Sequence, residues 1–372
     1  MRRIVGTLAC ALALAACATM QLRAATPTYR LVGYVVGAET LPPIPAEELS
    51  ALNFAFAHID ARGRVALDQT GTQRFLAGMR ALKSRNPRLQ IVLSVGGWGA
   101  DGFSDAAATP ASRLAFADSA ADALGREDLD GIDIDWEYPG LPGPGIRHRD
   151  EDRRDFTLLL AALRTRFDAL ARERGRSRPY LITAALADSE FVAHIELDRI
   201  HAYLDWINLM TYDFHNSLTK TTGHHSALAR SATSAEGERS VEHAVAQFLA
   251  AGVPADKLVV GVPFYGRAFA DVAPRNDGLD QPYGKYAGEF TWPQLADLID
   301  KNGYVRHWDD TAHEPYLWNA QTRTFVSYDD PQSLALKAAY VRAHHLGGMM
   351  YWEQSQDPGG ALVGVLARGL RP

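Results

Sequence analysis

Cysteine is nearly absent from this chain of 372 residues, since Cys10 and Cys17 are its only two cysteines. We expect residues 1–16 to be removed as a signal peptide, which leaves a single cysteine in the mature chain. An intramolecular disulfide is thereby excluded, and so is a metal site built from cysteines.

A surplus of positive charge is also lacking. The chain has 38 Lys and Arg against 44 Asp and Glu, and its net charge of −6 becomes −8 when the two arginines of the signal peptide are removed. A protein that binds nucleic acid needs basic residues to neutralise phosphates, so we expect no nucleic-acid partner. Hydrophobic residues at 47% and charged residues at 22% indicate a folded globular protein and exclude a disordered chain or a coiled coil.

The N-terminus lacks a hydrophobic run long enough to span a bilayer. Arg2 and Arg3 precede an apolar run at 4–16, which is the pattern of a signal peptide. The run ends in LAAC at 14–17, which resembles the bacterial lipobox and implies that Cys17 is lipidated and that residues 17–28 tether an exported protein to a membrane. Ala18 after this cysteine implies the outer membrane. The alternative is an ordinary secretory signal with an Ala-rich cleavage site, and a periplasmic or secreted protein.

A glycine-rich dinucleotide fingerprint is absent after the first apolar run, which argues against a Rossmann fold. Instead, apolar runs of strand length alternate with amphipathic segments, as is typical of a parallel sheet covered by helices. The eight runs lie at 29–36, 51–58, 89–95, 130–136, 180–187, 206–212, 258–264 and 348–352, and helix-like segments lie at 73–83, 111–124, 153–172 and 241–250. The sequence therefore predicts an α/β fold, a (β/α)8 TIM barrel formed by residues 29–267 and 331–372, with an open doubly wound sheet as the alternative.

The interval between the seventh and eighth runs is too long for one helix. Residues 268–330 are rich in aromatic side chains. We predict that they form a small α+β insertion at the C-terminal face of the barrel, followed by a helix at 331–345.

The segment DGIDIDWE at 130–137 is the most informative part of the chain. Side chains alternate between the two faces of a strand, so Asp133, Asp135 and Glu137 share one face. Burying three carboxylates together is costly unless a site uses them, and burial with mutual repulsion raises at least one pKa, which suits a general acid. Glu137 lies at the C-terminal end of the strand, where barrel enzymes keep their chemistry. The alternatives are a solvated acidic edge strand and a divalent-cation cluster.

This DxxDxDxE pattern resembles glycoside hydrolase family 18, the chitinases and their relatives, and the resemblance extends over about residues 29–358. It implies that Glu137 is the acid, that Asp135 steers the substrate's acetamido group, and that Asp133 shares a proton or a hydrogen bond with Asp135. In that family the acetamido group itself assists hydrolysis. The resemblance implies no cofactor and no metal.

Three further segments resemble motifs of the same family. Ser94 in SVGGW implies a hydrogen bond to the inner aspartate, and the two glycines allow a close approach of the backbone. Met210 begins MTYD, in which Tyr212 and Asp213 match the residues that hold the acetamido group. Arg267 in PFYGRAF matches an arginine that contacts sugar.

Aromatic residues complete the expected binding site. Trp352 in GGMMYWE matches the tryptophan on which the sugar at the cleavage subsite rests. Tyr34 and Phe56 match aromatic residues of the subsite wall, and Trp98 matches a platform on the leaving-group side. Histidine pairs at 224–225 and 344–345 stand in loops or at helix ends, where we expect solvated side chains rather than metal ligands.

The resemblance implies a monomeric chitinase that hydrolyses β-1,4 bonds between N-acetylglucosamine residues of chitin or chitooligosaccharides with retention of configuration. The segment WEYP at 136–139 and the insertion favour this branch over endo-β-N-acetylglucosaminidases that act on glycoproteins or peptidoglycan. A catalytically silent chitin-binding lectin is the remaining alternative, and the presence of Glu137 argues against it.

Overall fold

The computed structural model describes residues 29–67 and 69–371. The expected signal peptide, Cys17 and the tether lie outside this part of the chain. Within it, no helix is both long enough and apolar enough to cross a membrane.

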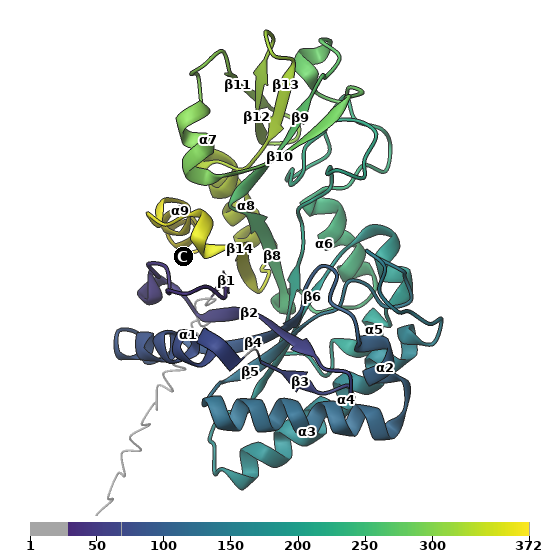
Figure 1. Cartoon of the computed structure of the whole chain (residues 1–372). Coiled ribbons are helices and arrows are strands. Elements are labelled where there is room, and N and C mark those ends of the chain that lie inside the picture. The colour runs from purple at the N-terminus through teal and green to yellow at the C-terminus, as the bar shows by residue number, and fades with distance from the viewer. Residues whose placement is uncertain (1–28, 68, 372) are drawn as a thin grey trace, which may run out of the picture.

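Eight parallel strands close into a barrel, as the alternation of apolar and amphipathic segments predicts (Figure 1). Closure is complete because the first strand pairs in parallel with both the second and the last, where Arg30 lies opposite Gly348 and Val32 lies opposite Ala51. The barrel strands are β1 (Arg30–Val36), β2 (Ala51–Ile59), β4 (Gln90–Gly96), β5 (Gly131–Asp135), β6 (Leu181–Leu186), β7 (Trp206–Leu209), β8 (Leu258–Pro263) and β14 (Gly348–Trp352), and the short β3 (Val65–Ala66) pairs with β2. The TIM-barrel prediction is thus confirmed.

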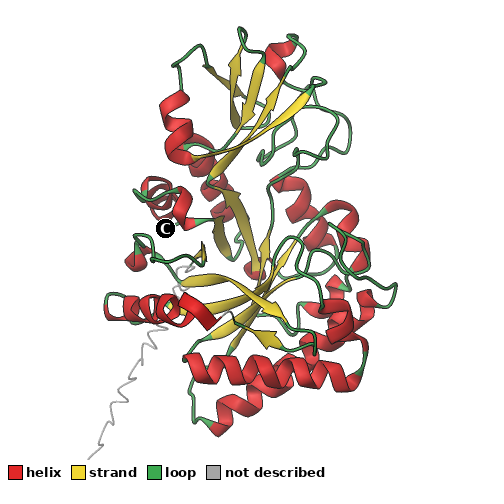
Figure 2. Ribbon diagram, in the orientation of Figure 1, coloured by secondary structure: helices red, strands yellow, loops and turns green. Residues whose placement is uncertain are grey.

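Helices surround the barrel (Figure 2). They are α1 (Gln69–Ala81), α2 (Phe103–Ala108), α3 (Pro110–Glu127), α4 (Asp152–Glu173), α5 (Leu197–Ile200), α6 (Val241–Ala250), α8 (Pro331–Ala343) and α9 (Ala361–Gly369), with 3-10 turns at η1 (Ala46–Glu48), η2 (Leu82–Ser84), η3 (Ser189–His194), η4 (Ala255–Lys257), η5 (Asn276–Gly278) and η6 (Gln354–Gln356). Side chains fix where several begin. Thr109 caps α3 with Pro110 in the first turn, and Asp330 caps α8 in the same way with Pro331.

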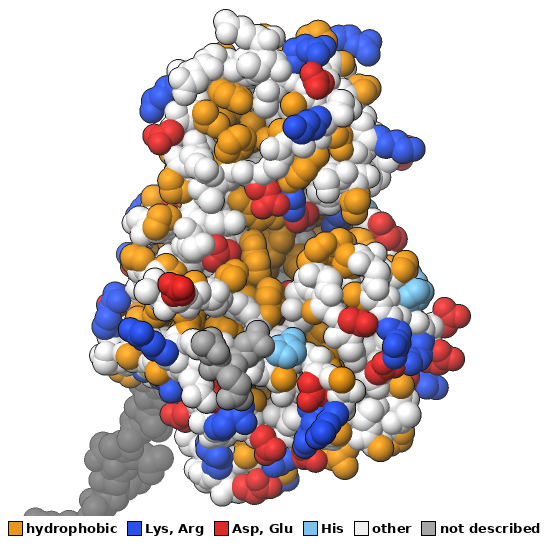
Figure 3. All heavy atoms as spheres, in the orientation of Figure 1, with side chains coloured by type: hydrophobic (Ala, Val, Ile, Leu, Met, Phe, Trp, Pro, Cys, Tyr) orange, Lys and Arg blue, Asp and Glu red, His pale blue; other side chains and the backbone are white. Residues whose placement is uncertain are grey.

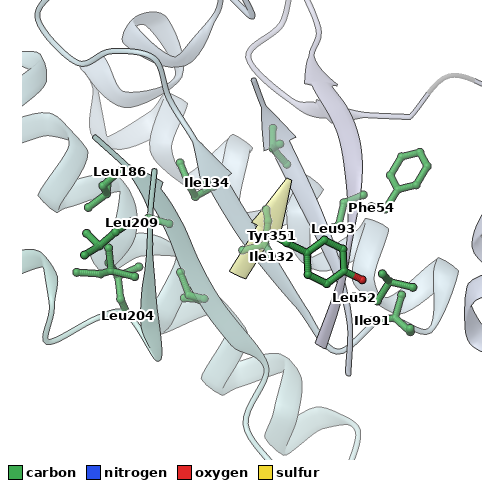
Figure 4. Close-up of a cluster of buried hydrophobic side chains, with 14 of the residues drawn as sticks. Leu52, Phe54, Ile91, Leu93, Ile132, Ile134, Leu186, Leu204, Leu209 and Tyr351 are labelled. Atoms are coloured by element: carbon green, nitrogen blue, oxygen red, sulfur yellow. The ribbon is translucent and has the colours of Figure 1, made fainter. Parts of the chain in front are cut away.

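The core lies between the strands and these helices (Figure 4). Ile132, Ile134 and Trp136 of the acidic segment point into it, as the alternation predicts. Asp133 and Asp135 therefore point to the inside of the barrel. A small apolar cluster fills one end of this interior, and polar side chains lie toward the other end.

A second sheet is inserted between β8 and β14 and forms the upper part of the molecule in Figure 1. It is antiparallel, in the order β10-β9-β13-β12-β11. Its elements are β9 (Tyr265–Ala270), β10 (Lys285–Thr291), α7 (Trp292–Leu298), β11 (Val305–Asp309), β12 (Glu314–Asn319) and β13 (Thr324–Ser327). The sheet begins at Tyr265, three residues before the expected 268, because Tyr265 and Gly266 already pair with β10. Hydrophobic side chains gather in the hollow between this sheet and the barrel (Figure 3).

Two barrel strands end earlier than their apolar runs. β7 ends at Leu209 because Thr211 turns away, with its backbone N–H 2.9 Å from the Leu209 carbonyl and its hydroxyl 2.6 Å from the Gly261 carbonyl. Tyr212 and Asp213 consequently stand beyond the strand. Glu137 likewise follows β5 instead of ending it. Both segments thus place their functional side chains on the rim.

Candidate active site

Asp133 is the buried centre of the site. Its Oδ2 accepts hydrogen bonds from the hydroxyls of Tyr34 and Ser94, each at 2.7 Å. Its Oδ1 accepts hydrogen bonds from Thr183 Oγ1 at 2.6 Å and from Asn208 Nδ2 at 3.1 Å. Burial raises the pKa of Asp133, and these four donors offset that only in part. The hydrogen bond from Ser94 is the one that the family resemblance implies.

Asp135 lies above Asp133 on the same strand and is less well satisfied. Its Oδ1 is buried and has no hydrogen-bond partner among the described residues. Burial, followed by the charges of Glu137 and Asp133, raises the pKa of Asp135 well above its usual value. Asp133 accepts its four hydrogen bonds from other residues, and the direct sharing between the two aspartates that the resemblance implies stays a prediction. Asp135 is left with an acceptor free for an incoming group.

The backbone beside Asp135 is packed too closely to admit a side chain. Gly96 has a φ of 118°, and a Cβ there would lie 2.0 Å from the Asp135 carbonyl oxygen. The next glycine, Gly97, donates its N–H to that oxygen at 2.9 Å. The close approach expected of the two glycines is therefore present, and it holds β4 against the acidic strand.

Glu137 stands at the rim and remains partly exposed. Burial and the charge of Asp213 raise its pKa to about 7, against a lowering contribution from the Tyr138 hydroxyl. A carboxyl group with this pKa is protonated in a large fraction of molecules near neutral pH. It can therefore give a proton to a bound group and take one back.

The pKa of Asp213 is shifted in the opposite direction to that of Glu137. Its Oδ1 accepts hydrogen bonds from the Tyr265 hydroxyl and from Arg267 Nε, both at 2.7 Å, and its Oδ2 accepts one from Arg267 Nη2 at 2.6 Å. Although burial alone would raise the pKa of Asp213, His225 and Arg267 hold it well below its usual range. Asp213 is therefore a fixed negative charge beside Glu137.

Tyr212 and Met210 lie beside this pair. The Tyr212 ring meets the Tyr265 ring edge to face at 6.5 Å. Burial and the charge of Asp135 raise its pKa well above the usual value, so its hydroxyl stays protonated and can donate a hydrogen bond. Met210 is half-buried, and its backbone N–H bonds to the Leu186 carbonyl at 2.9 Å.

An aromatic floor lies across the barrel mouth from β5. Trp352 stacks on Phe56 with ring centroids 5.6 Å apart and a 22° angle between the planes, and it also contacts Tyr34 at 5.6 Å. Trp352 and Phe56 are partly exposed, as a sugar platform requires. Tyr34 is only 1% exposed, so it acts on the site through its hydroxyl and not as an open wall.

Trp98 stands on the rim, and its side chain is 59% exposed. Its ring meets Tyr138 edge to face at 6.3 Å, and Tyr138 stacks on Phe191 at 4.0 Å. The large exposed face of Trp98 is thus supported from behind by two aromatic rings. Such a surface suits the apolar face of a sugar ring.

Several residues of the site escaped the sequence prediction. Thr183, Asn208, Tyr265 and His225 all contact its carboxylates, yet none carried a local signal apart from the position of Tyr265 inside the PFYGRAF segment. The prediction of solvated histidines at 224–225 is wrong, because both side chains are buried against carboxylates of other segments. The pair at 344–345 is exposed as expected.

The arrangement combines a proton donor and acceptor, a carboxylate with a free oxygen, a fixed charge and stacking surfaces for sugar rings. It is suited to acid–base cleavage of a glycosidic bond. Within residues 29–67 and 69–371, no group of three or more His, Cys, Asp or Glu side chains is placed to hold a metal ion.

Comparison with known proteins agrees with this geometry. The family model for glycosyl hydrolases family 18 matches residues 30–357. The chain is 43% identical over 296 residues to chitinase A1 of Niallia circulans, an alignment that covers 75% of this chain and 42% of the relative. It is 32% identical to chitinase B of Serratia marcescens, with 88% of this chain and 77% of the relative covered. The chain thus spans less than half the length of chitinase A1.

A solved structure extends the likeness to the fold. An N-acetylglucosaminidase of glycoside hydrolase family 18 from Paenibacillus barengoltzii superposes with a TM-score of 0.85 at 38% identity, covering 92% of this chain and 99% of that one. The barrel, the carboxylates of the acidic strand and the sequence match lead to the same assignment. The chain belongs to glycosyl hydrolases family 18.

Proposed function

We propose that the protein is a chitinase that hydrolyses β-1,4 bonds between N-acetylglucosamine residues of chitin or chitooligosaccharides with retention of configuration. The observation that carries the proposal is the pairing of Glu137, with its pKa near 7, and Asp135, with its unpartnered Oδ1. Likeness over most of this chain to proteins named chitinases supports the substrate class.

Glu137 acts first as the acid. It protonates the oxygen of the leaving sugar while the acetamido carbonyl of the substrate attacks its own anomeric carbon. Asp135 Oδ1 accepts the acetamido N–H and stabilises the positive charge of the resulting oxazolinium ion. Glu137, now ionised, takes a proton from the attacking water, and the configuration is retained.

The other residues position the reacting sugar. Tyr212, with its protonated hydroxyl, and Asp213, fixed by Arg267, face the acetamido side. Trp352 supports the ring that is cleaved, and Trp98 supports the ring that leaves. Precise placement of this kind contributes through proximity rather than through chemistry of its own.

The test is digestion of N-acetylchitohexaose by the chain without residues 1–16, read by mass spectrometry. Glu137→Gln removes the proton and keeps the shape, so hydrolysis falls by about 100-fold or more while binding is kept. The matched control is Glu127→Gln, the same substitution at the C-terminal end of α3, where Glu127 is buried beside Arg80 and Arg126. Its rate should stay within about twofold of the native rate.

Other outcomes of the same digest select the alternatives. Asp135→Asn should also slow hydrolysis strongly, and a native rate in that variant contradicts assistance by the acetamido group. No cleavage of the oligomer, with release of glycans from a glycoprotein or of fragments from peptidoglycan, indicates an endo-β-N-acetylglucosaminidase. Binding without cleavage of any of these substrates indicates a lectin.

We also propose that the protein is a monomer exported and anchored to the outer membrane by lipid on Cys17, on the basis of the LAAC segment at 14–17. Expression of the full chain in a bacterium fed labelled palmitate tests this. The native chain should carry label and sediment with outer membranes, whereas Cys17→Ser should carry none and remain in the soluble fraction. Light scattering of the soluble form measures its oligomeric state.

A further inference from the structure

His225 is a buried histidine whose ring nitrogens make no hydrogen bond to the described residues. Its side chain is 0% exposed, and neither ring nitrogen has a hydrogen-bond partner within 3.5 Å among the described residues. Buried polar groups in proteins are nearly always paired, so an orphan of this kind calls for a role. Burial lowers the pKa of His225, which keeps the imidazole neutral, with one N–H to donate.

The group that this N–H faces is the carboxylate of Asp213. Nδ1 of His225 lies 3.6 Å from Asp213 Oδ1, and its ring packs on Tyr265 at 5.4 Å. The charged groups that act on His225 are Asp213 from the loop after β7, Arg267 from β9 and Asp329 from the segment after β13. Asp213 already takes three hydrogen bonds, but all of them come from β9. His225 approaches the same carboxylate from a different segment.

The backbone of His225 is held firmly. Its N–H donates to Ser327 Oγ of β13 at 2.8 Å, and its carbonyl accepts from the Phe214 N–H at 3.1 Å. The loop that carries Asp213 is thereby closed back on itself and tied to the inserted sheet. The imidazole has little freedom to move away from Asp213.

The next residue, Ser226, fixes the loop a second time. Its hydroxyl lies 2.8 Å from Glu314 Oε1 of β12 and 2.8 Å from Asp329 Oδ2. Lys337 of α8 completes this buried cluster, 2.5 Å from Asp329 and 3.2 Å from Glu314. All four side chains are buried. The inserted sheet and α8 therefore meet at the residue that follows His225.

We propose that His225 is a positioning residue for the hydrolysis, whose neutral imidazole directs Nδ1–H at Asp213 and holds that carboxylate in place from its buried side. The inference rests on the proposed function, in which Asp213 orients the substrate. The 3.6 Å gap closes to an ordinary hydrogen bond of about 2.9 Å when a bound sugar competes for the donors of β9, since catalytic contacts often tighten only in the complex.

The experiment measures kcat and KM with 4-nitrophenyl diacetylchitobioside as the probe. His225→Leu fills the space without a donor, and we expect kcat to fall about tenfold with KM within about twofold. His225→Asn keeps an N–H close to the position of Nδ1 and should recover most of kcat. The matched control is His224→Leu, because His224 is also buried and lies 3.2 Å from a carboxylate, that of Asp309, away from the catalytic group. It should keep the native kcat.

A double-mutant cycle separates positioning from general damage. In an Asp213→Ala background, His225→Leu should lower kcat no further, because the oxygen that Nδ1–H is proposed to hold is gone. The proposal is overturned if the Asp213 and His225 substitutions lower kcat by independent factors that multiply in the double variant. It is also overturned if the His224 and His225 variants lose kcat equally. An inactive native protein contradicts the proposed function instead, which distinguishes the two failures.

Discussion

Glu137→Gln should make the protein more stable above neutral pH while it removes activity. In the folded protein the pKa of Glu137 is raised from 4.5 to about 7 by burial and by Asp213. The folded state therefore binds this proton more tightly than the unfolded state. The contribution of this protonated side chain to the free energy of unfolding is fully present below about pH 4.5. It is lost as the pH rises through 7, where the folded protein must accommodate an ionised carboxylate.

The magnitude follows from the shift. A difference of about 2.5 pKa units corresponds to about 3 kcal/mol, which the partial exposure of Glu137 reduces to about 2 kcal/mol. Glutamine cannot ionise and avoids this cost. At about 2 °C per kcal/mol for a chain of this size, the Tm of Glu137→Gln should exceed the native Tm by about 4 °C at pH 8.5.

Scanning calorimetry at pH 5 and pH 8.5 measures the effect. The excess should be small at pH 5, where the folded native side chain is protonated. Glu127→Gln serves as the control for the substitution itself, since it makes the same chemical change outside the site. An equal difference in Tm at both pH values would refute the raised pKa, and with it the physical reason for choosing Glu137 as the acid.

Three further outcomes are expected. Because Glu137 must be protonated to act, kcat/KM should decline as the pH rises through about 7, and Asp213→Asn should move this decline to lower pH by removing a negative charge. Lys337→Met should lower the free energy of unfolding measured in urea by about 3–5 kcal/mol, whereas Glu314→Gln should cost far less, since burial and the charge of Asp329 raise the pKa of Glu314 and keep it protonated. Gly96→Ala should yield little folded or active protein by circular dichroism and assay, because its methyl group meets a backbone oxygen.

The fold and the centre of the site were predictable because their signals are local. Strands, helices and the two faces of the acidic strand follow from periodicity over a few residues, and the close approach at Gly96 follows from its motif. The early end of β7 was not predictable, since the turn at Thr211 depends on the carbonyl of Gly261 in another strand.

The partners of the carboxylates were hidden for the same reason. Thr183 and Asn208 stand in apolar strands and reach Asp133 only when the barrel closes, across 50 and 75 positions of the chain. His225 has the sequence context of a solvated loop residue, yet it is buried, with its backbone N–H bonded to Ser327 of the inserted sheet. Long-range closure of this kind leaves no pattern in a short window of sequence.

β9 belongs both to the inserted sheet and to the site around Asp213, and this limits how the fold can be re-engineered. The strand starts the inserted sheet, and it also carries Tyr265 and Arg267, which fix Asp213. Cutting out the insertion to make the enzyme shorter, or exchanging it for that of a relative, would remove these partners of Asp213 unless the first three residues of the strand stay with the barrel. A viable graft boundary for protein engineering therefore lies after Arg267, inside a strand, and not at the loop where domain boundaries are usually chosen.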